Sequence, residues 1–414
     1  MKIAFVTQPS HSVLPPAGSL EIWTREVGKR LVARGHDVVV YASATEGVVP
    51  GAHDGIEFRF VQHALDRALA RLLRPLYRVL PAPRPFFSSR LFPLAYWARV
   101  AARLRAEEVD VVHVFNYSQA LPLLRRLVPR AALVLHMQCE WLTQLAPGMV
   151  DRRLRHADLV LGCSDAILDK ARAAFPHHAH RCVTVHNGVD VDRLGRVRDS
   201  VDRSGHRLLF VSRISPEKGV HVLIEAFNRL AETDPDVELT LVGDDAVIPL
   251  QMAVRLAEDE VVRELERFYE SDYRQTLVSL LSPAAARRVT FTGGVPYDDV
   301  AQQYERADIF VLPSLLEAFG MPAAEAMAAG LPVVASRSGG IVEIVADGET
   351  GLLVPPDDAA ALAEALLTLL RDPDRRIRMG AAGRACASDR FSWDRITGET
   401  EDAFGRARAR SLPG

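Results

Sequence analysis

The sequence is poor in cysteine, in lysine and in long apolar runs. Its four cysteines, Cys139, Cys163, Cys182 and Cys386, lie far apart with no C-x-x-C spacing, which excludes both a zinc ribbon and a disulfide framework. No apolar run approaches the ~20 residues needed to span a bilayer. Residues 1–7 also lack the apolar core and the cleavage site of a signal peptide. A cytoplasmic protein is therefore expected.

An excess of charge is also missing, because 50 basic and 53 acidic side chains leave a formal net charge of −3. A protein with so little net charge is not expected to bind a polyanion such as nucleic acid through its overall charge. The content of 48% hydrophobic and 25% charged residues is typical of a globular protein and excludes wholesale disorder. At roughly 150 residues per domain, 414 residues predict two or three domains.

Short apolar runs alternate with helical patterns through both halves of the chain. In the first half, the strands are expected at 3–7, 38–41, 109–114, 133–136, 159–162 and 182–186. In the second half, they are expected at 207–212, 237–242, 289–292, 309–312 and 332–335. The clearest helices are expected at 20–34, 217–231, 298–305, 322–329 and 359–370. Continuous apolar strands separated by helices are typical of parallel sheets covered on both faces.

A linker composition separates the two halves, since residues 187–205 combine glycines with Asp and Arg side chains. We therefore predict an α/β protein of two doubly wound domains that face each other across a cleft, with ligands at the carboxyl ends of the strands. The expected parts are a first domain at 1–189, a second domain at 190–390 and a C-terminal helix within 391–414.

Two segments do not fit this alternation. Residues 65–105 carry nine arginines against one acid, Asp66, with aromatic residues between them. This segment is either a set of core-packed helices with solvated arginines or a basic amphipathic surface for a membrane or a polar acceptor. Residues 245–287 are predicted to be a mostly helical insertion, which we interpret as a solvated decoration.

The first motif that indicates chemistry is FVSRISPEKGV at residues 210–220. It is expected to leave a strand, turn at Ser215-Pro216 and start a helix at Glu217. Lys218, one of only four lysines, would then lie in a first helical turn, where a cation is electrostatically unfavourable unless an anion binds there. Arg213, Lys218 and a helix N-terminus together would stabilise a diphosphate leaving group.

The second motif is PSLLEAFGMPAAE at residues 313–325, which follows the strand at 309–312. Glu317 precedes a glycine turn, Pro322 is placed at the start of a helix, and Glu325 is expected in its first turn. Free N–H groups around Phe319, Gly320 and Met321 would bind a phosphate, and a nearby carboxylate suits paired ribose hydroxyls.

Together these motifs resemble those of a known enzyme family. Glu317 and Glu325 enclose seven residues, and the run through AGLPVVA at 329–335 to SGG at 338–340 closely resembles the E-x7-E region of retaining GT-B glycosyltransferases, in particular glycosyltransferase family 4. Arg213 and Lys218 match its R-x4-K motif. The segments DGETGLLV at 347–354 and NGVD at 187–190 match two further motifs of that family.

The resemblance implies roles for individual residues of the donor site. Arg213 and Lys218 would neutralise the donor diphosphate, Glu325 would hold the ribose hydroxyls, and Glu317 would contact the transferred sugar. Backbone amides at 318–321, which span Ala318, Phe319, Gly320 and Met321, would face the sugar or the phosphates. Gly18 occupies the place of a glycine-rich donor loop, although AGS at 17–19 lacks the paired glycines of the family.

The resemblance also implies how the rest of the molecule takes part. His113 and His136 each end a predicted strand, so both would point toward the cleft. The resemblance implies that His136 lies near the reacting centre, and His113 is expected on the acceptor side. No metal is expected to be essential. H-H-x-H at 177–180 invites a metal interpretation, but no acidic or cysteine ligand accompanies it in the sequence, so a solvated loop is expected there. A helix from Ser392 to Arg408 should cross back onto the first domain.

The expected activity is transfer of a sugar, with retention, from a nucleotide-diphosphate donor, expected to be UDP-linked, to a hydroxyl of a small polar or glycosidic acceptor. One alternative is a peripheral-membrane enzyme that uses a lipid-linked acceptor and contacts the membrane through 65–105. Others are a UDP-sugar epimerase of the same fold and a non-catalytic sugar-binding relative. A Rossmann dehydrogenase is disfavoured, since no G-x-G-x-x-G follows the first strand.

Overall fold

The computed structural model describes residues 1–7, 13, 18–43, 51–73, 81, 83–90, 92–196 and 205–411. The chain divides into two compact units, which we call the first unit (Met1–Asn187 with Trp393–Gly414) and the second unit (Gly188–Ser392). The chain passes from one unit to the other after residues 187 and 392. The domain boundaries expected from the sequence were after residues 189 and 390.

The first unit is built on a sheet with the order β3-β4-β2-β1-β5-β6-β7-β8. Its strands are β1 (Lys2–Val6), β2 (Asp37–Ser43), β3 (Gly51–His53), β4 (Ile56–Val61), β5 (Val111–Phe115), β6 (Ala132–Met137), β7 (Leu159–Gly162) and β8 (Cys182–Thr184). Neighbouring strands are parallel except for the β3–β4 pair. β5, β6 and β7 are buried along their whole length, as expected of parallel strands covered on both faces.

Helices cover this sheet in two groups. They are α1 (Ser19–Ala33), α2 (Ala64–Leu73), α3 (Leu94–Glu107), α4 (Leu121–Leu127), α5 (Trp141–Gln144), α6 (Pro147–Leu154), α7 (Asp165–Ala174) and α18 (Trp393–Ser411). One group is α1 with α18, and another contains α3 with α4. Among the helices of the described residues, none is both long and apolar enough to cross a membrane.

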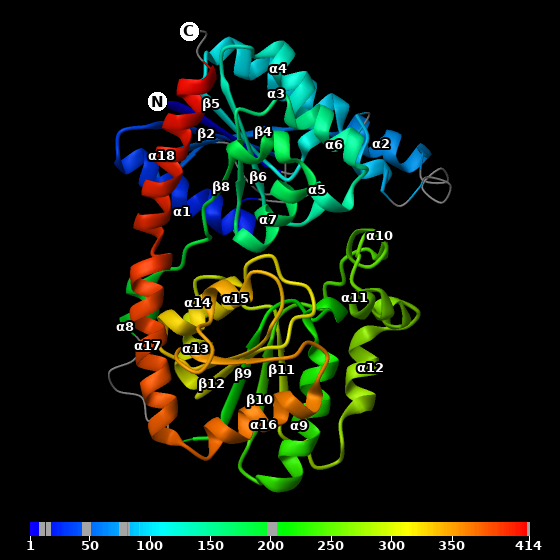
Figure 1. Ribbon diagram of the computed structural model, residues 1–414, viewed down its shortest axis with the longest axis vertical. Helices are drawn as coiled ribbons and strands as arrows, with labels where there is room; N and C mark the ends of the chain where they lie inside the picture. The colour runs from blue at the N-terminus through cyan, green and yellow to red at the C-terminus, as the bar shows by residue number, and fades with distance from the viewer. Residues whose placement is uncertain are drawn as a thin grey trace. The chain divides into compact units, whose positions relative to one another are not determined.

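The C-terminal helix α18 is an integral part of the first unit. It lies beside α1 and packs on β6 (Figure 1), although it follows the second unit in the chain. The Phe404 ring is fully buried, with its centroid 6.3 Å from that of Phe5. At the rim, Arg34 pairs with Glu401 at 2.9 Å. This is the helix that the sequence places at 392–408.

The second unit contains a parallel sheet with the order β11-β10-β9-β12-β13-β14. Its strands are β9 (Arg207–Val211), β10 (Glu238–Val242), β11 (Val289–Gly293), β12 (Ile309–Leu312), β13 (Val333–Ser336) and β14 (Gly351–Val354). Its helices are α8 (Val191–Arg196), α9 (Val220–Thr233), α10 (Leu250–Ala253), α11 (Glu260–Glu264), α12 (Tyr273–Leu280), α13 (Ala301–Arg306), α14 (Met321–Ala328), α15 (Ile341–Ile344), α16 (Ala359–Leu370) and α17 (Pro373–Phe391). The prediction of an α/β protein with two doubly wound units is thus confirmed.

The insertion at 245–287 is helical, as predicted, but it is not a solvated decoration. Its apolar side chains, among them Val254, Val262 and Leu265, form a buried cluster with Leu315, which lies just after β12. The buried Tyr273 hydroxyl of α12 also lies 2.9 Å from His221 Nδ1 of α9. Its Glu and Arg content suggested solvation, whereas the apolar residues between them pack the insertion onto the sheet's loops.

Candidate functional site

The segment with Arg213 and Lys218 connects β9 to α9. A 3₁₀ turn, η5 (Pro216–Lys218), precedes Gly219, whose φ of 67° is left-handed, and α9 begins at Val220. A Cβ atom at Gly219 would lie 2.0 Å from the Pro313 carbonyl oxygen, so glycine is required here. The helix therefore starts three residues later than predicted. Lys218 is not in its first turn, and the helix-dipole argument for Lys218 was wrong.

Lys218 instead joins the two predicted motifs through an ion pair. Its Nζ lies 2.7 Å from Glu317 Oε2, with both side chains largely buried, and Ser314 Oγ donates to the same oxygen at 3.3 Å. The pair spans 99 positions of the chain, so the local motifs contained no sign of it. Sequence analysis assigned Lys218 to the donor diphosphate and Glu317 to the transferred sugar. In the structure the two side chains are direct neighbours.

Glu217, to which the sequence analysis gave no role, links the same two motifs. Its buried carboxylate accepts hydrogen bonds from Ser215 Oγ at 2.6 Å and from Arg213 Nη2 at 3.2 Å. Its main-chain carbonyl accepts from the N–H groups of Leu315 at 2.9 Å and Leu316 at 3.3 Å. Arg213 is the more exposed partner, so Glu217 holds the guanidinium of a side chain that is still partly open to solvent.

The E-x7-E loop leads into α14, which starts at Met321 with Pro322 as its second residue. At the start of α14, Pro322 has no N–H, and the N–H groups of Ala323 and Ala324 already donate to the Gly320 carbonyl oxygen at 2.9 and 3.3 Å. An anion at this helix start would therefore bind through the amides that precede Pro322. Gly339 packs closely against this loop. A Cβ atom there would lie 1.8 Å from the Glu317 carbonyl oxygen, so only glycine fits. Phe319 is buried, with its ring centroid 5.7 Å from that of Phe391, whereas Ala318 is half-buried.

Glu325 is a buried carboxylate in the second turn of α14, not in the first turn as predicted. The hydroxyl of Tyr304 donates to its Oε2 at 2.7 Å. Burial raises the pKa of the Glu325 carboxyl to about 7, although the Tyr304 hydrogen bond and the charge of Arg193 act in the opposite direction. Arg193 is itself held over the Tyr297 ring, 4.3 Å from its centroid. Glu325 is therefore a carboxyl whose protonation changes close to neutral pH.

The two predicted histidines pair with each other inside the first unit. His136 Nδ1 lies 3.1 Å from His113 Nε2, and both rings are fully buried beside Trp23. Gln138 donates to His136 Nε2 at 3.0 Å, and its amide orientation follows from a reciprocal pair with Asn187. Burial lowers the pKa of His136 to about 3, and burial with the neighbouring His136 lowers the pKa of His113 well below its usual value. The expectation that both side chains point into a cleft was wrong, because neither is exposed.

Gly18 is the residue before α1, with extended backbone at φ −123°. A Cβ atom there would lie 2.6 Å from Glu21 Oε2. The residues of the predicted donor loop before it, including Ala17, lie outside the described residues. In the H-H-x-H segment, expected as a solvated loop, His178 is buried and its Nε2 lies 3.1 Å from Asp151.

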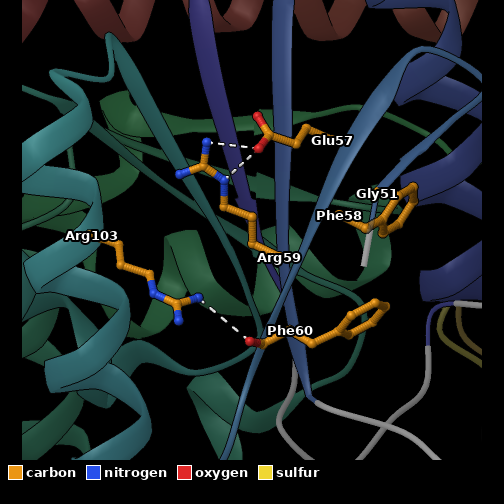
Figure 2. A pocket seen from close by; sticks show the side chains of 6 residues that line it. All are labelled: Gly51, Glu57, Phe58, Arg59, Phe60 and Arg103. Carbon is orange, nitrogen blue, oxygen red and sulfur yellow. Dashed lines mark hydrogen bonds and ion pairs between the residues drawn. The ribbon is translucent and has the colours of Figure 1, made fainter. Parts of the chain in front are cut away.

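The charged side chains around one surface hollow of the first unit are already engaged in local contacts. A surface hollow beside β4 is lined by Glu57, Arg59 and Arg103, and it contains none of the predicted site residues (Figure 2). There Arg59 pairs with Glu57 at 2.8 Å, while Arg103 reaches the Phe60 carbonyl oxygen at 3.5 Å. This hollow is therefore a weak candidate for a charged ligand.

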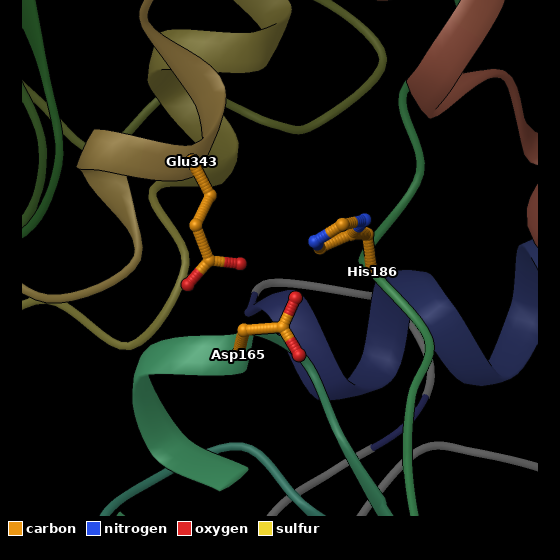
Figure 3. Close-up of side chains that lie close together, drawn as sticks. All are labelled: Asp165, His186 and Glu343. Carbon is orange, nitrogen blue, oxygen red and sulfur yellow. The ribbon is translucent and has the colours of Figure 1, made fainter. Parts of the chain in front are cut away.

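Figure 3 labels three side chains of metal-ligating type, Asp165 at the start of α7, His186 after β8, and Glu343 on α15. Asp165 and His186 belong to the first unit and Glu343 to the second. Within the first unit, Asp165 is held by Thr184 and Arg172. Within either unit taken by itself, the described residues contain no cluster of three such side chains.

Comparisons with known proteins agree with this arrangement of motifs. The family profile described as glycosyl transferases group 1 matches residues 200–385, and that described as glycosyltransferase family 4 matches residues 20–193. A D-inositol 3-phosphate glycosyltransferase of Xylanimonas cellulosilytica is 30% identical, over 95% of this chain and 93% of its own. A glycogen synthase of Mycobacterium tuberculosis is 26% identical, over 94% and 92%.

Solved structures share the fold over nearly the whole chain. Sucrose-phosphate synthase from Thermosynechococcus elongatus has a TM-score of 0.73 at 23% identity, covering 99% of this chain and 100% of its own. HepE of Anabaena, in complex with UDP and glucose, has a TM-score of 0.69 at 24% identity, covering 98% and 99%. With both family profiles matched in chain order and a relative 30% identical over nearly its full length, the chain belongs to the family 4 glycosyltransferases and has the GT-B fold.

Proposed function

We propose that this chain moves a sugar, with retention of anomeric configuration, from a UDP-sugar to a hydroxyl of a small polar or glycosidic acceptor. The observation that carries the proposal is the Lys218–Glu317 ion pair, which joins the R-x4-K and E-x7-E motifs in one place. The HepE structures with UDP and with UDP-glucose support a uridine donor. The names of the inositol phosphate glycosyltransferase and the glycogen synthase support a polyhydroxylated acceptor.

The donor diphosphate would bind where two cations are already oriented. Glu217 holds Arg213 and Glu317 holds Lys218 in this structure. A diphosphate would compete with these carboxylates, and the cations would then stabilise the charge that builds on the leaving oxygen. The N–H groups of Phe319, Gly320 and Met321 would add donors at the start of α14, and Glu325 would accept from the ribose hydroxyls.

In the proposed transfer, the acceptor hydroxyl oxygen forms a bond to the anomeric carbon on the face that the diphosphate leaves. The bond from that carbon to the β-phosphate oxygen breaks, and the hydroxyl proton passes to the departing phosphate oxygen. No step needs a metal ion. Because both ring nitrogens of His136 are engaged, His136 would act by orienting the half-buried amide of Gln138. For the buried His113, an acceptor-side role stays a prediction.

Replacing Lys218 by alanine tests this proposal. Losing a charge contact to a developing phosphate oxygen costs about 2.7–4 kcal/mol, so Lys218→Ala should lower turnover roughly 10²–10³-fold. A matched control is Lys29→Ala, which removes another lysine paired with a carboxylate, Glu26, at 2.7 Å on α1. Initial rates would be measured with UDP-, GDP- and ADP-sugars over pools of acceptors. Near-wild-type transfer by Lys218→Ala would refute the proposal, and interconversion of UDP-GlcNAc without acceptor would favour the epimerase.

One observation favours a second candidate, a peripheral-membrane enzyme with a lipid-linked acceptor. On α2, Leu65, Leu69 and Leu72 are 63%, 36% and 75% exposed at a spacing that places them on one helical face. The single acid, Asp66, is buried, because it accepts from the N–H groups at the start of α3. The exposed charges of α2 are therefore basic, which suits an anionic lipid surface.

Vesicle co-sedimentation separates the two candidates. Salt-sensitive binding to anionic vesicles that disappears when Arg71, Arg74 and Arg78 are replaced would favour the membrane enzyme. Of these arginines, Arg74 and Arg78 lie outside the described residues. Transfer to soluble acceptors without vesicle binding would favour the small-molecule acceptor.

A further inference from the structure

The Glu325 carboxylate is held on one side only. Tyr304 donates to Oε2 at 2.7 Å, and among the described residues it is the only side chain that hydrogen-bonds to this carboxylate. A carboxylate has two oxygens with about four lone-pair sites. Oε1 therefore keeps its capacity to accept hydrogen bonds, which is what a pair of neighbouring hydroxyls on a ligand requires.

Tyr304 is too deeply buried to touch a ligand itself, and the nearest acceptor of its hydroxyl is Glu325. Tyr304 belongs to α13, is fully buried, and packs with its ring centroid 5.8 Å from that of Phe310 in β12. Burial raises the pKa of its hydroxyl well above the usual value, so the group stays a proton donor. The Pro322 carbonyl oxygen is also near, at 3.4 Å, but a hydroxyl has one proton, and the closer, charged acceptor takes it.

The geometry restricts how Glu325 can move. Without a partner on Oε2, the end of a glutamate side chain rotates among several orientations, and ordering it on ligand binding has an entropic cost. With Oε2 fixed by a rigid aromatic hydroxyl, Oε1 is directed before the ligand arrives. We propose that Tyr304 is a positioning residue for the donor ribose, which it orients through Glu325. This inference rests on the proposed function, in which Glu325 accepts from the ribose hydroxyls.

The test compares two nucleotides on the same protein by calorimetry. UDP has both ribose hydroxyls, whereas 2′,3′-dideoxyuridine diphosphate has neither. The wild-type protein should bind UDP at least about tenfold more tightly than the dideoxy nucleotide. Tyr304→Phe, which keeps the ring against Phe310, should lower UDP affinity about tenfold and leave the affinity for the dideoxy nucleotide unchanged.

The control is Tyr273→Phe, which removes another buried tyrosine hydroxyl of the second unit, bonded to His221 rather than to Glu325. It should leave both affinities unchanged. In a Glu325→Ala background, Tyr304→Phe should cause no further loss of UDP affinity. Because each comparison is a ratio of affinities on one preparation, partial unfolding does not imitate the result.

Three outcomes would overturn the proposal. If Tyr304→Phe weakens both nucleotides equally, or neither, Tyr304 does not act on the ribose contact. If the wild type binds both nucleotides equally tightly, the ribose role of Glu325 fails and the role of Tyr304 fails with it. If the wild type binds UDP, GDP and ADP not at all, the proposed function itself is wrong.

Discussion

Among the single residues of the site, Glu325 is the one whose ionisation should govern donor binding near neutral pH. Burial raises the pKa of its carboxyl to about 7, so the carboxyl gains a proton as the pH falls through that value. A neutral carboxyl is a weaker acceptor than a carboxylate. His136, with its pKa lowered by burial to about 3, stays neutral in this range and adds nothing.

We therefore expect UDP affinity to fall as the pH is lowered from about 8 to about 6, by up to about tenfold per unit below the pKa. Glu325→Gln should bind UDP more weakly at about pH 8 and should lack this dependence. Calorimetry of both proteins over the same pH series checks it, since the phosphate's own ionisation is common to both. A glutamine variant with the wild-type pH dependence would show that another group is responsible.

The sequence names the residues of the candidate site, but it does not name their partners. Arg213, Lys218, Glu317 and Glu325 stand in motifs of fixed spacing, so the motifs alone name them. The Lys218–Glu317 pair depends on how β9 and β12 lie side by side, which is a property of the sheet. Likewise, the burial of His136 depends on neighbours distant in the chain, and its position at a strand end gave no sign of it.

Among the elements, the insertion at 245–287 makes a prediction about stability. Tyr273 of α12 is buried, and its hydroxyl meets both Nδ1 and the backbone N–H of His221, at 2.9 and 3.2 Å. Tyr273→Phe should lower the free energy of unfolding by about 1–3 kcal/mol, because it leaves a buried polar group without its partner. Denaturant unfolding measures this loss. Thr368→Val, at an exposed position of α16, is a suitable control.

If Tyr273→Phe were as stable as the wild type, the insertion would be bound more loosely than these contacts indicate. Hydrogen exchange across α10, α11 and α12 would then be expected to show little protection. Strong protection in the wild type, reduced by Tyr273→Phe, agrees with a packed insertion.

Element positions follow from the sequence where the apolar pattern is strong. β7, β12 and α16 lie where the pattern predicts them, because each is a continuous or periodic apolar run. β4 and β14 were missed. β4 mixes buried residues with exposed and half-buried ones next to the short β3, and β14 lies within the motif at 347–354, where no strand was expected. The start of α9 was misplaced because a left-handed Gly219 interrupts an otherwise helical pattern.

In the whole molecule, the first unit is completed by the last helix of the chain. The Phe404 ring of α18 is fully buried near Phe5 and lies 5.7 Å from the His113 ring. Phe404→Ala should therefore destabilise the first unit by about 3–5 kcal/mol, because it leaves a cavity in its core. Thermal unfolding measures this effect. Ile377→Ala, at an exposed position of α17, should change stability far less, and equal effects of the two variants would contradict the packing of α18.

The central claim is that the paired motifs perform sugar transfer from a nucleotide diphosphate with retention. The most direct measurement is proton NMR of the glycoside formed from α-linked UDP-glucose, or from whichever nucleotide sugar the donor screen identifies, recorded before the product can equilibrate. The account predicts an α-glycoside from the wild type, formed roughly 10²–10³-fold more slowly by Lys218→Ala. A β-glycoside, or an α-glycoside formed at the same rate by both proteins, would contradict it.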